Sequence, residues 1–129
     1  TSLGMANLQG SRSLMQLSLP LPNSANTHWR HGRGITYLSK QGRDYRYLVA
    51  NAVQDANQPM MLGRLSVEVY IYPRDKRMID IDNRAKPLLD ALQHAGAFKD
   101  DSQVDKLYLE RREVIPGGKC VVKITELGE

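Results

Sequence analysis

The chain has 129 residues, 18 lysines and arginines against 14 aspartates and glutamates, and a sequence pI near 9.3. Its length fits one domain, and no apolar stretch approaches the roughly 20 residues of a membrane span. The single cysteine, Cys120, excludes an intramolecular disulfide and lies in an apolar run, which favours a small core residue over a nucleophile. With no secretory signal visible, we expect a cytoplasmic protein that does not bind membranes. Its net charge of +4 favours a polyanionic binding partner.

Residues 1–14 contain Gly, Ser, Asn and Gln without a hydrophobic period. We expect this stretch to be a vector-derived remnant or a disordered arm that takes no part in the fold. The folded domain is therefore expected to span residues 15–129.

The sequence of the first half of this domain predicts a strand, a loop and a helix. Residues 15–19 alternate between apolar and polar, which indicates a short strand that ends at Pro20. Residues 20–36, rich in Asn, His and Gly, are expected to form a loop. Ser39 can cap a helix that runs to about Ala56. Its apolar face comprises Tyr45, Leu48, Val49, Ala52 and Val53.

A clear alternation over residues 64–72 predicts a second strand, followed by a basic loop and a second helix that ends at Gly96. Pro87 lies within the helical pattern, although it lacks an N–H and clashes with the preceding turn. We therefore expect the helix to become regular near Lys86 or Pro87, after an irregular or 3₁₀ turn over residues 82–85.

The last part of the chain predicts two strands, over residues 104–114 and 119–127, joined by a hairpin turn at residues 116–118. Leu107 and Leu109 are expected on one face of the first of these strands. The order β-α-β-α-β-β predicts an α/β (α+β) single domain, a mixed sheet with two helices on one face.

Carboxylates gather around the second helix. Asp80 and Asp82 point to the same side in an extended backbone, and the helix and its following loop can bring Asp101 beside Asp80. At an effective dielectric near 20, two such charges ~4 Å apart repel by roughly 4 kcal/mol, so three of them require a cation or raised pKa values. Oxygen ligands suit Mg²⁺ or Mn²⁺, and Lys86 lies one turn from Asp82, where it could stabilise a phosphate.

Simpler roles fit the same acidic residues. Asp82 or Asn83 could cap the helix, and Lys86 could form a surface pair with Asp90 at the i,i+4 spacing. Asp100 and Asp101 could belong to an ordinary turn that leads into the next strand. On residue types alone, a metal site and these structural roles both remain open.

Basic side chains form two clusters, either of which could be a solvated face or a phosphate-binding surface. The first consists of Arg30, Arg33, Lys40, Arg43 and Arg46, and the second of Arg74, Lys76 and Arg77. His28 and His31 are spaced like metal ligands on one helical turn, but the Gly-rich loop expected there favours phosphate contact or simple exposure over zinc.

The combined pattern resembles the RusA family of crossover-junction endodeoxyribonucleases, the Holliday-junction resolvases. The matching segments run in the same order over most of the chain from Met15 onward. They are Pro20–Asn26, His31–Gly34, Asp80–Asn83, Lys86, Asp90–Leu92, Asp100–Val104, Gly117–Gly118 and Ile124–Glu126. This sequence departs from the family pattern at Pro87 and in its extended amino terminus.

The resemblance implies a homodimer that binds branched DNA and cuts four-way junctions by paired symmetric nicks, in DNA recombination and repair. It implies that Asp80, Asp82 and Asp101 bind Mg²⁺, with Mn²⁺ able to substitute, and that Lys86 assists catalysis. The candidate DNA-binding residues are then Arg30, Arg33, Lys40, Arg43, Arg74, Lys76 and Arg77. The alternatives are a non-catalytic architectural protein that binds junctions and a protein-interaction module whose basic surface is incidental.

Overall fold

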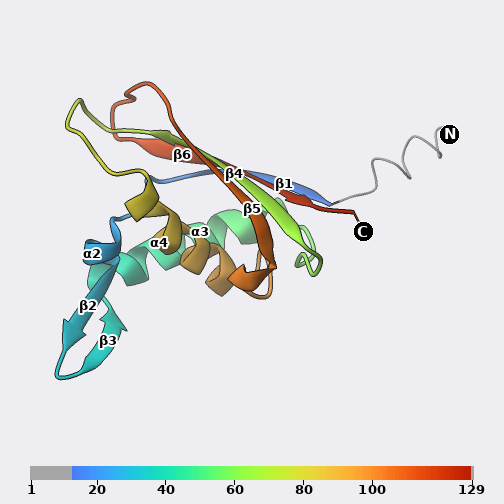
Figure 1. The fold of residues 1–129 in the computed structure, drawn as a ribbon, viewed down its shortest axis with the longest axis horizontal. Coiled ribbons are helices and arrows are strands. Elements are labelled where there is room, and N and C mark those ends of the chain that lie inside the picture. Colours follow the sequence, from blue (N-terminus) through green and yellow to red (C-terminus); the bar gives the residue numbers. More distant parts are fainter. Residues whose placement is uncertain (1–12, 129) are drawn as a thin grey trace, which may run out of the picture.

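The computed structural model describes residues 13–128, which form a four-stranded sheet with two long helices on one face (Figure 1). In chain order the elements are β1 (Leu14–Leu19), α2 (Ala25–His28), β2 (Trp29–Gly32), β3 (Ile35–Leu38), α3 (Lys40–Ala56), β4 (Leu65–Tyr72), α4 (Asp82–Ala95), the 3₁₀ turn η1 (Asp101–Gln103), β5 (Val104–Arg111) and β6 (Lys119–Glu126). The α+β class and the mixed sheet agree with the expectation from sequence.

The sheet has the strand order β1-β6-β4-β5. Strand β6 pairs antiparallel with β1 and β4, and β5 pairs parallel with β4. The hairpin expected between the last two strands is therefore wrong, because β4 lies between them. The backbone N–H of Arg112 donates to the Ile71 carbonyl and that of Ile115 to the Pro73 carbonyl. These bonds carry the chain around the end of β4 before Gly117 and Gly118 turn it, both with positive φ.

Helix α3 begins where the sequence predicts. The hydroxyl of Ser39 accepts a hydrogen bond from the Gly42 N–H, as an N-cap side chain does. Tyr45, Val49 and Val53 are buried, but Leu48 is 46% exposed, which corrects its assignment to the apolar face. Among residues 13–128 no helix has both the length and the apolar character needed to span a membrane.

Helix α4 begins at Asp82, earlier than expected, and ends at Gly96 with φ 86°. The expected irregular turn over residues 82–85 is thus helical, although the Arg84 N–H bonds to the Ile81 carbonyl three residues back. Pro87 is the sixth helical residue and lies buried. Its missing N–H costs one intrahelical hydrogen bond, and the apolar residues around it keep the segment helical by packing against the sheet.

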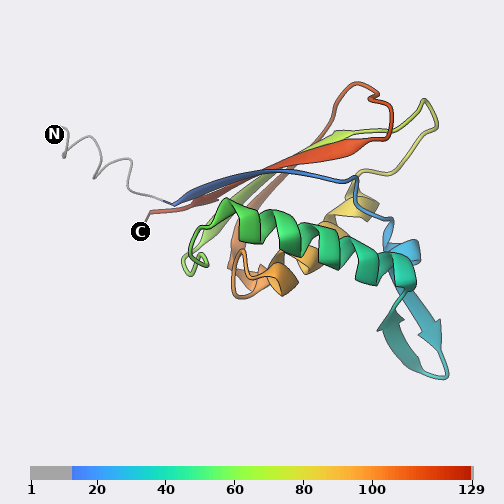
Figure 2. The ribbon, with the colours of Figure 1, turned by 180° about the vertical axis from the view of Figure 1, so that it is seen from behind.

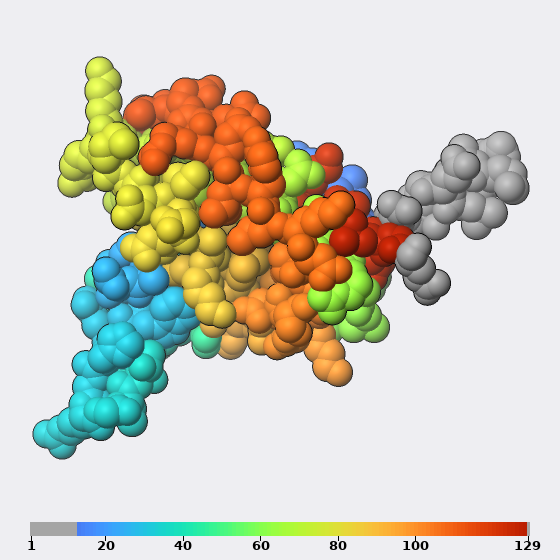
Figure 3. Space-filling model, viewed as in Figure 1, coloured from blue at the N-terminus to red at the C-terminus, as the bar shows by residue number. Residues whose placement is uncertain are grey.

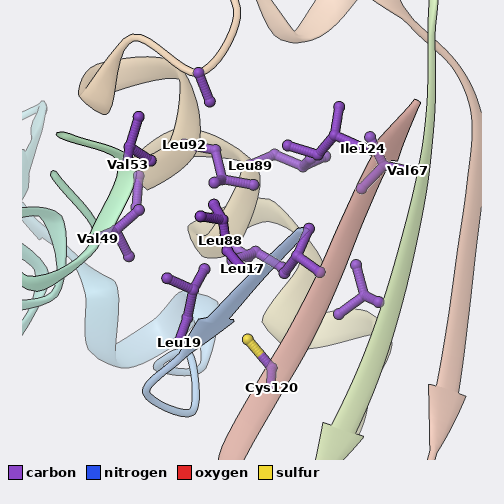
Figure 4. Packing of buried hydrophobic residues seen from close by; sticks show 14 of the residues in the cluster. Leu17, Leu19, Val49, Val53, Val67, Leu88, Leu89, Leu92, Cys120 and Ile124 are labelled. Carbon is purple, nitrogen blue, oxygen red and sulfur yellow. The ribbon is translucent and has the colours of Figure 1, made fainter. Parts of the chain in front are cut away.

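The core fills the space between the sheet and the two long helices, which cover the same face in both ribbon views (Figure 2). Leu17 and Leu19 of β1 meet Val49 of α3 and Leu88 of α4 (Figure 4). Cys120 is fully buried here, as expected, and burial raises the pKa of its thiol to about 12. On β5, Leu107 is 44% exposed, whereas Val104 and Leu109 pack against the core.

A small β-hairpin formed by β2 and β3 projects from the body of the molecule (Figure 3). The expected loop over residues 20–36 is therefore wrong for its second half, and α2 occupies part of its first half. Arg33 and Gly34 both have positive φ, 51° and 77°, which is typical of a two-residue turn of type I′. The Gly-rich stretch is thus the turn of a hairpin.

Candidate active site and DNA-binding surface

The acidic segment lies where the β4–α4 loop enters α4. Asp80 is exposed in the loop, and Asp82 is the exposed first residue of the helix. The N-cap position is occupied by Ile81, which makes no side-chain capping bond, so the capping interpretation of Asp82 is wrong. Within residues 13–128, neither carboxylate takes part in an ion pair.

Lys86 connects the second turn of α4 to η1. Its Nζ lies 2.9 Å from Oδ2 of Asp101, and the expected surface pair with Asp90 does not form. The backbone N–H of Asp101 donates to Oε1 of Gln93 at 2.9 Å, near the end of the same helix. Two residues of α4 thus hold Asp101 alongside the helix, with its carboxylate next to the ammonium group of Lys86, a side chain that is 65% exposed.

Asp100 and Gln103 form a capping box that shapes η1. The Asp100 carboxylate accepts from the Ser102 N–H. Hydrogen bonding from Ser102, first from its side chain and then from its backbone, lowers the pKa of Asp100 more than the charge of Lys86 does. Gln103 is buried and donates to the carbonyls of Met61 and Gly63. The turn role considered for Asp100 is therefore present. The role of Gln103 was missed, although Asp-x-x-Gln spacing signals such a box.

The acidic side chains do not converge on one point. Within residues 13–128, no three or more His, Cys, Asp or Glu side chains lie close enough together to hold a metal ion. Asp80 and Asp82 lie at the start of α4, whereas Asp101 is held along it by Lys86 and Gln93. The donors are nevertheless all carboxylate oxygens, which is the chemistry that Mg²⁺ and Mn²⁺ prefer.

Asp90 lies at the centre of a polar network between α2, α3 and α4. It accepts two hydrogen bonds from Arg46, at 3.0 Å each, and one from Nε2 of His28 at 3.0 Å. Burial alone would raise the pKa of Asp90, but the bonds from His28 and Arg46 outweigh it and lower that pKa to about 2. His28 is completely buried, so the expectation that it is exposed or contacts phosphate is wrong.

The basic residues fall into two places. Arg30 and Arg33 are exposed on the β2–β3 hairpin, and Lys40 and Arg43 follow in the first turn of α3. Lys40 pairs with Asp44, and Arg43 donates to the Leu38 carbonyl, so both remain at the surface.

The second place is the β4–α4 loop, where Arg74 and Lys76 are exposed and Arg77 pairs with Asp75. Figure 3 shows the hairpin and this loop at the same end of the molecule. Arg84, which no sequence pattern singled out, lies next to this loop and lines a pocket with Arg74. Positive charge thus flanks the segment that carries Asp80 and Asp82.

Comparison with known proteins places this geometry in a wider context. A family model described as "Endodeoxyribonuclease RusA" matches residues 20–125. The chain is 39% identical to "Crossover junction endodeoxyribonuclease rusA" of Enterobacteria phage HK97 over 113 residues, which cover 87% of this chain and 94% of that protein. Over the same shares of both chains it is 35% identical to the protein of that name from Escherichia coli (strain K12) and 34% identical to that of Enterobacteria phage 82.

Proposed function

Because the chain belongs to the RusA family of endodeoxyribonucleases, we propose that it resolves four-way DNA junctions by paired, symmetric nicks that depend on Mg²⁺. The observation that carries this proposal is the similarity over 94% of the length of relatives named crossover junction endodeoxyribonucleases. The acidic residues beside α4 and the basic residues around them supply side chains suited to the cleavage of a phosphodiester. The biological setting that follows is DNA recombination and repair.

Asp80, Asp82 and Asp101 are the proposed metal ligands. Their oxygen donors fit Mg²⁺, and Mn²⁺ is expected to substitute because it accepts the same donors. A bound ion of this kind lowers the pKa of a coordinated water and offsets charge on the phosphate. Asp100 is left out, since its carboxylate already caps η1.

Lys86 is proposed to stabilise the negative charge that develops on the scissile phosphate. Its side chain is 65% exposed and lies on the side of α4 next to η1, so it can turn from Asp101 to a phosphate oxygen. A donor aimed at developing charge contributes more in the transition state than in the ground state. The expected products carry 5′-phosphate and 3′-hydroxyl ends.

The seven basic residues are proposed to bind the DNA backbone. They are Arg30, Arg33, Lys40, Arg43, Arg74, Lys76 and Arg77. Phosphate contacts of this kind set the orientation of the DNA and make its affinity depend on salt. Cations on both sides of the acidic segment offset the repulsion that its carboxylates would exert on a polyanion.

A homodimer is proposed because a four-way junction has approximate twofold symmetry. Two identical subunits related by the same axis place one acidic site at each of two opposed strands. One set of Asp80, Asp82, Asp101 and Lys86 in each chain then suffices for two cuts.

The test is cleavage of a synthetic mobile four-way junction, beside a linear duplex of the same sequence, in Mg²⁺ and in EDTA. We expect symmetric nicks only in the junction and only with Mg²⁺. Tight binding to the junction without nicks in Mg²⁺ or Mn²⁺ would instead indicate an architectural DNA-binding protein. Equal and weak affinity for branched and linear DNA would contradict both functions.

A further inference from the structure

A pocket of about 330 Å³ lies between the segment that joins β1 to α2 and the loop that joins β4 to α4. Arg74 and Ile79 of this loop line it, and so does Arg84 from the first turn of α4. Ile79 immediately precedes Asp80, and Arg84 follows Asp82 by two residues. The pocket therefore adjoins the acidic segment at the start of α4.

The pocket carries an excess of positive charge. Three arginines line it, Arg74, Arg77 and Arg84, against one acidic residue among its described lining residues, Asp75. Arg77 occupies the Asp75 carboxylate with its backbone N–H at 3.0 Å and its Nη2 at 2.7 Å. Neither Arg74 nor Arg84 has a carboxylate partner within residues 13–128.

Arg84 is held in place with part of its hydrogen-bonding capacity unused. Its Nη1 donates to the Pro22 carbonyl at 2.6 Å, which fixes the guanidinium against the β1–α2 segment. Its Nε is buried and has no hydrogen-bond partner in the described part of the chain. Arg74 lines the same pocket. Two guanidinium groups that repel each other beside a pocket are stabilised by an anion between them.

We propose that this pocket binds one phosphate of the DNA backbone next to the phosphate that is cleaved, with Arg74 and Arg84 as its ligands. The assignment rests on the proposed function, since it takes branched DNA as the polyanion. The planar guanidinium binds phosphate through two parallel hydrogen bonds, which fixes direction as well as charge. A phosphate held here sets the register of the strand relative to Asp80 and Asp82.

The first experiment measures equilibrium binding of a fluorescent four-way junction in EDTA over a series of salt concentrations. Arg74→Gln and Arg84→Leu are each expected to weaken binding about five- to twentyfold and to lower the salt dependence by about one counterion. Because both arginines bind the same phosphate, the double variant should bind the junction only slightly less tightly than the single variant with the lower affinity. Lys106→Gln, which removes an exposed charge from β5, is the matched control and should change neither quantity.

Circular dichroism and thermal unfolding check that each variant is folded. Arg84→Leu loses the bond to Pro22. If that variant is unstable, Arg74→Gln decides the question through the position test that follows, because loss of sensitivity at one flanking phosphate distinguishes a contact to that phosphate from a general contribution of Arg74 to binding. Effects no larger than that of Lys106→Gln, or fully additive effects of the two arginines, would overturn the proposal.

A second experiment locates the phosphate. Junctions with a single neutral methylphosphonate, placed in turn at each position around the cleaved bond, should bind less well to the unchanged protein at one flanking position. Arg84→Leu and Arg74→Gln should be insensitive to the substitution at that position alone. The assignment to a backbone phosphate would be overturned if the variants were as sensitive as the unchanged protein to the methylphosphonate at that position. It would also be overturned if inorganic phosphate bound to the pocket without competing with DNA.

The two proposals fail in different ways. If the proposed function is wrong, the unchanged protein neither prefers nor cuts the junction. If only the phosphate pocket is wrong, the unchanged protein cuts the junction, Arg84→Leu binds it normally, and no flanking methylphosphonate loses its effect in Arg74→Gln.

Discussion

The carboxylate of Asp90, on α4, connects this helix to α3 and to the end of α2. It receives hydrogen bonds from Arg46 of α3 and from His28, the last residue of α2. His28 directly precedes the β2–β3 hairpin, so this network fixes the base of the projecting basic arm to the helix that carries Asp82 and Lys86. A paired carboxylate with little exposure contributes more to stability than a surface pair does.

Asp90→Asn is expected to lower the free energy of unfolding by about 1–2 kcal/mol at pH 7. The pKa of Asp90 is about 2 in the folded protein and 3.8 in its ordinary state, so the carboxylate stabilises the fold above about pH 4. This contribution disappears as the pH falls toward 2, where Asp90 is protonated. Urea unfolding from pH 7 to pH 2 should therefore show the variant and the unchanged protein converging in acid.

Asp105→Asn serves as the control for this measurement. Asp105 also pairs with an arginine, Arg64, but both side chains are exposed, at 43% and 55%. Its substitution should leave the urea midpoint of unfolding almost unchanged, because water screens an exposed pair. A loss as large as that of Asp90→Asn would show that burial is not what distinguishes the two pairs.

Asp82→Asn tests the acidic segment at the residue scale. The change removes one charge with almost no change in volume, and the Asp82 side chain makes no capping bond whose loss would disturb α4. We expect cleavage of a four-way junction to be abolished and binding of the same junction to be preserved. Gel-shift and nicking assays on one preparation check both. Loss of binding in this variant would contradict a role confined to catalysis.

At the scale of elements, strands and helices with strong hydrophobic periods could be predicted from the sequence. The alternation in β4 and the Ser39 cap of α3 depend on neighbours in the chain, and both are as expected. The β2–β3 hairpin could not be predicted by that rule, because each of its strands has only 4 residues, none of them buried, which is too short for a period to stand out. The position of β4 between β5 and β6 depends on pairing between strands that are far apart in the sequence. The turn residues at 116–118 do not reveal such pairing.

For the candidate site, too, the sequence predicted local features but not contacts between distant residues. Residue types and spacing identified Asp80, Asp82, Lys86 and Asp101 as candidates, but not which side chains touch. Lys86 has two acidic neighbours within reach of a surface pair, and only the docking of η1 against α4 decides that Asp101 is its partner. Arg84 resembled an ordinary helical residue until the fold placed it beside Arg74.

Gly42→Ala is expected to separate α3 from α2. A Cβ at residue 42 would lie 2.5 Å from the His28 carbonyl oxygen and 2.9 Å from Cγ of Leu38, closer than real contacts allow. The resulting shift should lower the free energy of unfolding by about 1–3 kcal/mol, although alanine favours helices. Chemical denaturation measures the loss. Gln41→Ala, at the exposed neighbouring position, should stay within about 0.5 kcal/mol of the unchanged protein.

At the scale of the whole molecule, each subunit of the proposed dimer is expected to cut one DNA strand. A mixed dimer of one unchanged subunit and one Asp82→Asn subunit should therefore nick one strand of a four-way junction and leave the opposed strand intact. Differently tagged subunits, co-expressed and purified by both tags, provide this species, and the nicks are mapped on a denaturing gel. Paired cuts by the mixed dimer would contradict one site per subunit.

The place of β6 in the sheet has a consequence for biosynthesis. β6 is the strand nearest the carboxyl end, yet it alone connects β1 to β4, because it pairs with both. On the ribosome, β1 has no strand partner until β6 emerges, and until then the apolar side chains of β1 and β4 cannot pack into one sheet. The sheet is therefore completed only after residues 119–126 leave the ribosome, and a nascent chain that lacks them exposes apolar strands.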